Sequence, residues 1–242
     1  MSELLTVSGL TKRFNGLTAV NAVSFSMERG EVVGLLGPNG SGKTTVLNMI
    51  SGHLRPTGGT IALDDQLISG LAPDQVARKS VSRTFQLVRS LPSLSVIENV
   101  AVALAFGPRK LWGSAAEEEA LARLDDVGLT HRAYQTAQDL TYIDLKRMEL
   151  ARALAAEPQL LLLDEWLAGL NPTELRAGID LIHSLKNRGI TILLVEHVME
   201  AIRAVCNRCV VMNAGRKIAD APTAEALANQ DVVTAYLGGH HA

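Results

Sequence analysis

The stretch "GPNGSGKTT", residues 37–45, fits the spacing G-x-x-x-x-G-K-[ST] and lies between the apolar run "GEVVGLL" and the apolar segment "TVLNMI". Glycines suit a loop that wraps an anion with successive backbone N–H groups, because such a loop needs positive φ angles and little side-chain bulk. A glycine turn with an incidental lysine is the alternative, and the flanking strand and helix patterns argue against it. We therefore predict a phosphate-binding loop with nucleotide contacts from Gly37, Pro38, Asn39, Gly40, Ser41, Gly42, Lys43, Thr44 and Thr45.

Two side chains of this loop have specific expected roles. Lys43 supplies a mobile positive charge for the β- and γ-phosphates, and the Thr44 hydroxyl is a ligand for Mg²⁺.

The apolar runs elsewhere in the chain predict an α/β fold. "GEVVGLLG", "QLLLLDE" and "ITILLVEH" are short and continuously apolar, which is typical of strands that are covered on both faces of a parallel sheet. "AVSFSMERG" instead alternates Val23, Phe25 and Met27 with serines, which predicts a strand with one wet face.

A long polar and helical interval separates the first two of these buried strands. Within it, "AAEEEALARLDDVGL" places Ala120, Leu121, Leu124 and Val127 on one stripe, with acidic residues in the first turn and Gly128 just past the end. We interpret residues 88–152 as an inserted helical subdomain. Residues 1–87 and 153–242 then form the nucleotide-binding core of one domain spanning residues 1–242.

The run "LTYIDLKRMELARALA" predicts a helix that starts within "LTYID", residues 140–144. Thr141 and Asp144 have the spacing of a capping box, in which each side chain accepts a hydrogen bond from a backbone N–H of the first turn. The next apolar residues repeat at helical spacing, at Leu145, Met148, Ala151 and Leu154. The free N–H groups of this helix start are either simply capped or directed at a ligand.

Composition excludes several classes of protein. A net charge of -2 and a pI near 6.3 give no overall attraction to nucleic acid or anionic lipid, although a local basic patch is compatible with both. The first residues lack the pattern of a signal peptide, and no apolar run approaches the roughly 20 residues that cross a bilayer. We expect a cytosolic chain, or one that other subunits hold at a membrane.

Cys206 and Cys209 form a C-x-x-C sequence, so a redox or metal site has to be considered. Redox motifs of this spacing typically lie between a strand and the helix that follows, whereas here a helical stretch leads into the strand "CVVMN". A second Cys or Cys/His pair that would complete a zinc site is missing nearby. We predict two packed thiols in a reducing compartment.

The second chemical signal is "LLLLDE", residues 160–165, a buried strand that ends in two carboxylates. Asp164 is placed to bind Mg²⁺, directly or through water, and Glu165 to polarise an attacking water. Two acids in a solvated turn would give the same letters, and the phosphate-binding loop in the same chain favours the catalytic interpretation.

The order of "GPNGSGKT", the glutamine in "RTFQ", "LLLLDE" and "VEH" resembles the ATP-binding subunit of an ABC transporter over essentially the whole chain. "RTFQ", "DE" followed by "AGLNP", "VEHVM" and the ending "AYLG" are most similar to the importer type for branched-chain amino acids. The resemblance implies a P-loop NTPase (RecA-like) core with an N-terminal antiparallel β subdomain and an inserted α-helical subdomain. It also implies ATP and Mg²⁺ as cofactors, and ATPase activity.

The resemblance assigns roles to residues that would not be singled out alone. Gln86 becomes the residue that senses Mg²⁺ and water and hinges the helical subdomain, and His197 the switch histidine that binds the γ-phosphate. Phe14, which by itself would be taken for a core residue, stacks on adenine. The implied catalytic residues are Glu165, His197, Lys43 and Gln86, and the implied metal ligands are Thr44, Gln86 and Asp164.

"LTYID" occupies the place of the family's signature, usually similar to L-S-G-G-Q, whose helix start faces the nucleotide of the other subunit in a head-to-tail dimer. Thr141 keeps a hydroxyl for this contact. Ile143, however, replaces a glycine, and a β-branched residue neither takes positive φ easily nor lets phosphate approach closely. Trp166 stands where the family usually has proline. This puts the placement of Glu165 in question, or marks Trp166 as a packing or dimer contact.

We therefore expect an ATPase subunit that powers import of branched-chain amino acids or a related small solute. Its expected partners are a second ATP-binding subunit, identical or different, integral membrane permease subunits and, indirectly, a solute-binding protein, with no nucleic acid. The expected location is peripheral, on the cytoplasmic face of the inner membrane. The alternatives are a regulatory subunit that hydrolyses weakly, motivated by Ile143 and Trp166, and a soluble ABC-type ATPase that acts on ribosomes or DNA.

Overall fold

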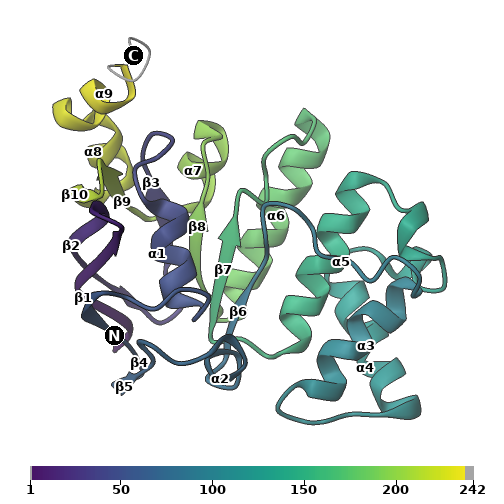
Figure 1. Ribbon diagram of the computed structural model, residues 1–242. Coiled ribbons are helices and arrows are strands. Elements are labelled where there is room, and N and C mark those ends of the chain that lie inside the picture. Colours follow the sequence, from purple (N-terminus) through teal and green to yellow (C-terminus); the bar gives the residue numbers. More distant parts are fainter. Residues whose placement is uncertain (1, 238–242) are drawn as a thin grey trace.

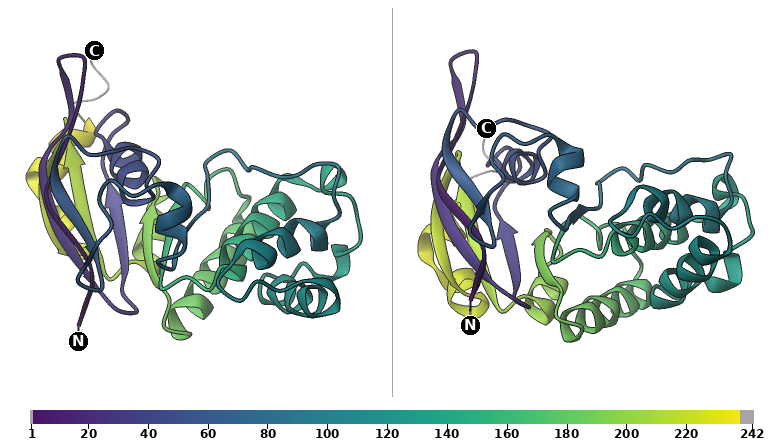
Figure 2. Two further views of the ribbon diagram at one scale, coloured as in Figure 1. Left: turned by 60° about the horizontal axis from the view of Figure 1, so that its bottom comes forward. Right: turned by 90° about the horizontal axis from the view of Figure 1, so that it is seen from below.

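The computed structural model describes residues 2–237, so the glycine of the ending "AYLG" lies outside the described residues. Two sheets and the helices between and beside them make up most of the molecule (Figure 1). The helices within residues 96–155 form the end opposite the first sheet, as the turned views also show (Figure 2).

The first sheet is antiparallel, with strand order β2-β1-β4-β5. Asn15 and Gly16 join β1 to β2 with φ angles of 39° and 94°, and Asn-Gly suits this turn because both residues tolerate positive φ. In β2, alternate residues from Val23 to Met27 are buried, which confirms the predicted alternation. The strands are β1 (Glu3–Phe14), β2 (Leu17–Glu28), β4 (Gly58–Leu63) and β5 (Gln66–Leu67).

The second sheet has the strand order β10-β9-β3-β8-β7-β6, in which only β10 is antiparallel to its neighbour within the described chain. Every residue of β3, β7 and β8 is buried, which confirms that the three apolar runs are interior strands. The strands are β3 (Val32–Leu36), β6 (Val81–Arg83), β7 (Leu160–Asp164), β8 (Thr191–Val195), β9 (Arg208–Asn213) and β10 (Arg216–Pro222).

Alternation along these buried strands divides the interior into two cores. Val33 and Leu35 of β3 pack with side chains of the antiparallel sheet and of α1 (Lys43–Ile50). Val32 and Leu36 point to the opposite face, where they join α5 (Tyr142–Ala155), α6 (Pro172–Asn187) and α7 (Met199–Val205). The parallel sheet is therefore the middle of three layers.

The helical end consists of α3 (Val96–Phe106), α4 (Gly113–Asp126) and the start of α5, which pack against one another. The predicted stripe on α4 is confirmed. Gly128 lies just past the helix end, as expected, and has a φ of 69°. One expectation was wrong, because α4 begins at Gly113 and its acidic residues 117–119 fall in the second turn. The remaining helices are α2 (Pro73–Ala77), η1 (Thr130–Arg132), η2 (Ala137–Asp139), α8 (Thr223–Ala228) and α9 (Gln230–Leu237).

Thr141 caps α5, but the capping box is only half formed. Its hydroxyl accepts a 3.3 Å hydrogen bond from the N–H of Asp144. The Asp144 carboxylate does not return a bond to the Thr141 N–H within residues 2–237; it is buried, and its Oδ2 lies 3.9 Å from Nε of Arg132. Asp144 therefore turns toward the helical interior.

Cys206 and Cys209 are free, buried thiols beside Gly34 of β3, as packed thiols should be. A Cβ at Gly34 would lie 3.2 Å from each sulfur, so the glycine makes room for both. No group of three or more His, Cys, Asp or Glu suited to a metal occurs in the part of the chain that the structure describes. Among residues 2–237, every helix is too short or too polar to span a lipid bilayer.

Candidate nucleotide-binding site

The loop between β3 and α1 has the backbone that an anion cradle needs. Gly37, Gly40 and Gly42 have φ angles of 142°, 78° and 104°. A Cβ at Gly37 would lie 2.1 Å from the Met212 carbonyl oxygen, and one at Gly42 would lie 2.7 Å from that of Ala19. Only glycine fits these two positions. The loop leads directly into α1, whose N-terminus has no side-chain cap among the described residues and so presents free N–H groups to an anion.

Lys43 spans this loop. Its Nζ donates to the carbonyl oxygens of Gly37 at 2.8 Å and Pro38 at 3.0 Å. Burial lowers the pKa of Lys43, while the nearby carboxylates of Glu165 and Asp164 act in the opposite direction. The Ser41 hydroxyl is buried and has no hydrogen-bond partner among residues 2–237.

Asp164 ends β7 and forms a buried ion pair with Arg83, 2.8 Å from Oδ2 to the guanidinium. Arg83 also donates a 2.6 Å hydrogen bond to the side chain of Asn48 on α1. Sequence analysis assigned no role to Arg83, although Arg83 opens the quoted stretch "RTFQ". The guanidinium joins the strand that leads to Gln86 with α1 and with the acidic end of β7.

Gln86, Glu165 and His197 come together just beyond the end of β7. The Gln86 amide donates a 2.7 Å hydrogen bond to Oε2 of Glu165. The exposed His197 ring has its Nδ1 4.0 Å from Oε1 of the same carboxylate. Glu165 has a positive φ of 51°, and its N–H donates to the carbonyl of Val195 at 2.8 Å. The carboxylate is thus approached from two loops at once.

The residues expected to bind Mg²⁺ face one cleft of about 560 Å³. A hydroxyl, an amide and a carboxylate there form an oxygen-donor set of the kind that Mg²⁺ prefers. The lining includes all three expected ligands, Thr44, Gln86 and Asp164, together with Asn48 and Arg83.

Phe14 and Thr141 lie outside this cleft. Phe14 ends β1 and is 42% exposed, with the Lys12 ammonium 5.0 Å from its ring centre, so it is a surface ring and not a core residue. Thr141 is exposed at the start of α5. Stacking of Phe14 on adenine and contact of Thr141 with a partner's nucleotide stay predictions.

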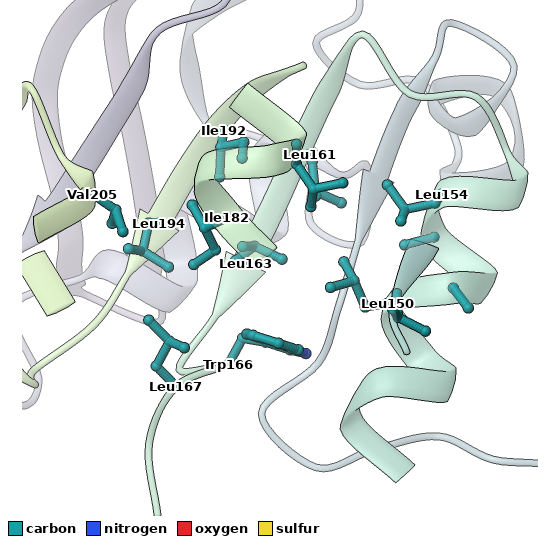
Figure 3. Close-up of a cluster of buried hydrophobic side chains, with 14 of the residues drawn as sticks. Leu150, Leu154, Leu161, Leu163, Trp166, Leu167, Ile182, Ile192, Leu194 and Val205 are labelled. Carbon is teal, nitrogen blue, oxygen red and sulfur yellow. The ribbon is translucent and has the colours of Figure 1, made fainter. Parts of the chain in front are cut away.

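The two departures from the family pattern have structural explanations. Trp166 is a packing residue, 2% exposed, in the cluster that also holds Leu150 and Leu163 (Figure 3). Its burial in the monomer rules out the dimer-contact alternative. Ile143 lies in the first turn of α5, where the backbone is right-handed, so the expected conflict with positive φ does not arise. Its bulk remains.

Two further side chains hold the site, and sequence reasoning missed both. The Tyr236 hydroxyl, on α9, accepts a 2.8 Å hydrogen bond from the N–H of Gly37. Glu196 accepts from the N–H groups of Leu167 at 2.6 Å and His197 at 3.3 Å, and burial raises its pKa. Tyr236 and Glu196 lie in the stretches "AYLG" and "VEH" that were quoted above, but no neighbouring residue in the sequence indicates which backbone groups they bind.

Known proteins of similar sequence match nearly the whole chain. A family model described as "ABC transporter" matches residues 20–168. The high-affinity branched-chain amino acid transport ATP-binding protein LivG of Salmonella typhimurium is 43% identical, over 97% of this chain and 98% of that protein. BraF of Pseudomonas aeruginosa, which carries the same description, is 41% identical over the same shares.

Solved structures agree with these relatives. The ADP conformation of MJ1267, an ATP-binding cassette of an ABC transporter, superposes with a TM-score of 0.90 at 28% identity and covers 98% of this chain and 100% of that one. The dimeric post-hydrolysis state of the cassette MJ0796, bound to ADP and Pi, gives 0.83 at 25% identity over 91% and 99%. The predicted fold and family are confirmed, and the chain belongs to the ABC transporter family.

Proposed function

We propose that this chain is the ATP-binding and ATP-hydrolysing subunit of an ABC importer. The observation that carries the proposal is the meeting of Gln86 and Glu165 at the end of β7, beside the glycine cradle and Lys43. It unites a phosphate site and a candidate base in one chain.

Each residue of the site has a proposed task. The loop N–H groups, the start of α1 and Lys43 hold the phosphates, and Lys43 has to leave the Gly37 and Pro38 carbonyls to do so. Thr44, Gln86 and Asp164 would hold Mg²⁺, and Asp164 keeps its ion pair with Arg83 through Oδ2. When bound, Mg²⁺ neutralises charge on the phosphates. Phe14 stacks on the base.

Glu165 acts as the general base, or orients the attacking water, for transfer of the γ-phosphoryl group to water. The Gln86 amide fixes one carboxylate oxygen, and His197 stands on the other side to stabilise phosphate charge. Because His197 is exposed, this part of the site is completed only when a second subunit covers it.

The second subunit supplies its own signature helix. The start of α5 in this chain, with Thr141 and Ile143, would close the nucleotide site of the partner. Thr141 already uses its hydroxyl as a helix cap, and Ile143 adds bulk where close approach is needed. We therefore propose an asymmetric heterodimer in which the site of this chain hydrolyses ATP and the site closed by "LTYID" does so weakly. This observation also favours the second candidate, a regulatory subunit within a transporter.

Permease subunits are proposed to dock beside the segment that follows Gln86. A groove of about 280 Å³ lies there, lined by residues that include His53, Phe85, Arg89, Glu149 and Arg152. The groove borders residues 88–152, the proposed helical subdomain, and Phe85 and Arg89 flank Gln86 in the sequence. A helix docked in the groove would therefore respond to movement of Gln86. Docking of this kind places the chain on the cytoplasmic face of the inner membrane, with a solute-binding protein acting indirectly through the permease.

Branched-chain amino acids, or a related small solute, are the proposed cargo, supported by the described role of LivG and BraF. The test is to copurify the chain with its membrane subunits and measure Mg-ATP-dependent phosphate release and uptake of leucine, isoleucine and valine into vesicles. Release coupled to uptake of any of these supports the function. A complex that forms without membrane subunits and acts on ribosomes or DNA contradicts it.

A further inference from the structure

Lys146 is a buried cation that the proposed chemistry does not yet use. It lies on α5, is 2% exposed, and donates from Nζ to three backbone carbonyls. These belong to Glu165 at 3.2 Å, Trp166 at 2.9 Å and Ala168 at 2.7 Å. An ammonium has three N–H donors, so all three are used to bind the segment of residues 165–168, which follows β7.

Two further hydrogen bonds hold the same segment. The Trp166 indole N–H donates back to the Lys146 carbonyl at 3.1 Å. The Glu196 carboxylate accepts from the Leu167 N–H at 2.6 Å. A buried cation thus binds carbonyls and a buried anion binds an N–H on consecutive residues, so each charge is matched to the backbone group of opposite polarity.

Glu165 needs such support, because its φ of 51° is a sparsely populated conformation for a residue with a Cβ. Conformations of this kind persist where the surroundings fix them. Lys146 reaches the carbonyl of Glu165 itself, so the ammonium helps to set the direction in which the carboxylate leaves the backbone.

Lys146 also contacts the start of α5, where the sequence predicts the signature "LTYID". Tyr142 precedes Lys146 by one helical turn, and its ring centre lies 4.7 Å from Nζ. Tyr142 is the first residue of α5, half exposed, and adjoins Thr141. A continuous set of contacts therefore runs from the start of α5, which is proposed to face a partner's nucleotide, to the Glu165 of this chain.

We infer that Lys146 is a positioning residue that ties the start of α5 to Glu165, so that the two nucleotide sites of a dimer are mechanically joined within this chain. The inference rests on the proposed function, because it gives Glu165 the role of base or water-orienter. Lys146 touches neither the glycine loop nor Lys43, so its effect should fall on turnover and not on nucleotide affinity.

The test is steady-state ATPase kinetics of the assembled transporter with Lys146→Met, which keeps the methylene packing and removes the ammonium. We expect kcat to fall about ten- to a hundredfold, as misplacement of a catalytic group does, with KM and nucleotide Kd within about twofold of wild type. Lys146→Arg keeps the charge but spreads its donors over a planar group, so it should recover part of kcat. Lys217→Met, which removes an exposed lysine paired with Asp220, is the matched control and should leave kcat unchanged.

A double variant separates positioning from a general loss of structure. In a Glu165→Gln background, Lys146→Met should leave the residual rate unchanged, because the group that it positions is already gone. A further tenfold loss there, or wild-type kcat in Lys146→Met and Lys146→Arg, overturns the inference. A wild-type complex that hydrolyses no ATP contradicts the proposed function instead. If Lys146→Met does not fold, Lys146→Arg decides: lowered kcat at unchanged KM supports the inference, and wild-type kcat overturns it.

Discussion

The Gln86 amide donates a 2.7 Å hydrogen bond to the Glu165 carboxylate, across 79 residues of sequence. Gln86 follows β6 and leads into the helical end, whereas Glu165 follows directly after β7. Any movement of the helices relative to the parallel sheet therefore has to act on this bond. The contact gives a physical route by which docking on the helical end controls the candidate base.

Tyr236→Phe should weaken nucleotide binding without unfolding the protein. The change removes the oxygen that accepts from the Gly37 N–H and keeps the ring packed. A single neutral hydrogen bond contributes about 0.5–1.5 kcal/mol, so the Kd for ATP should rise roughly two- to tenfold. Tyr134→Phe, which removes an exposed hydroxyl bonded to Glu117, is the control. Equal Kd values for the Tyr236 variant and wild type would show that α9 does not steady the loop.

Much of the fold was accessible from the sequence because its signals are local. Strand burial follows from continuous apolar runs, and the cradle follows from glycine spacing. The supports of the site were not accessible, because they join distant segments: Tyr236 meets Gly37 over 199 residues, and Arg83 meets Asp164 over 81. Lys146 looked like any polar position of a helix, since only the tertiary fold places carbonyls around it.

Two local expectations about helix starts failed. Spacing alone predicted a complete capping box at Thr141, but burial draws Asp144 inward. The acidic residues of α4 looked like a first turn because the sequence offers no signal that the helix starts at Gly113.

Glu149 should make the stability of the protein depend on pH. Burial raises its pKa to about 7, although N–H groups of Phe85 and Arg89 and the guanidinium groups of Arg89 and Arg152 favour the charged form. A raised pKa means that the folded state favours the protonated acid. The contribution of Glu149 to the free energy of unfolding is therefore complete below about pH 4.5 and is lost as pH rises to about 7.

Glu149→Gln removes this dependence and keeps an acceptor for the two N–H groups. Relative to wild type, the variant should gain stability between pH 5 and pH 7.5, by at most about 3 kcal/mol. Urea unfolding of both proteins at each pH measures the difference. If the two stability profiles stay parallel over this range, Glu149 does not titrate as the structure indicates.

Ile143→Gly should raise ATPase activity in the assembled heterodimer, or make both sites turn over. A charge-assisted hydrogen bond to phosphate contributes about 1.5–3 kcal/mol, roughly tenfold to 150-fold in rate if it acts only in the transition state. Because Ile143 lies in a right-handed turn, its bulk is the obstacle, so Ile143→Ala should act in the same direction with less loss of helix stability. If neither variant changes the rate or the number of hydrolysing sites, "LTYID" is a working variant signature and a homodimer is sufficient.

Cysteines introduced at Arg89 or Ser93 should crosslink to a cytoplasmic helix of the permease, since both residues are exposed and Arg89 lines the docking groove. The native thiols, Cys206 and Cys209, are buried and should not compete for the reagent. Asp231→Cys, on the exposed side of α9, is the control position. Crosslinks from residue 231 but not from residues 89 or 93 would place the permease on the face of the chain ends instead.

The central claim is that Glu165 drives hydrolysis once a partner closes the site, and Glu165→Gln tests it most directly. The isolated wild-type chain should bind Mg-ATP but hydrolyse it poorly, because the opposing signature helix is missing. In the assembled complex, Glu165→Gln should bind ATP with wild-type affinity, accumulate as a closed ATP-bound dimer, and release phosphate at a rate reduced by about 10²-fold or more. Wild-type phosphate release by the Glu165→Gln complex would contradict the account.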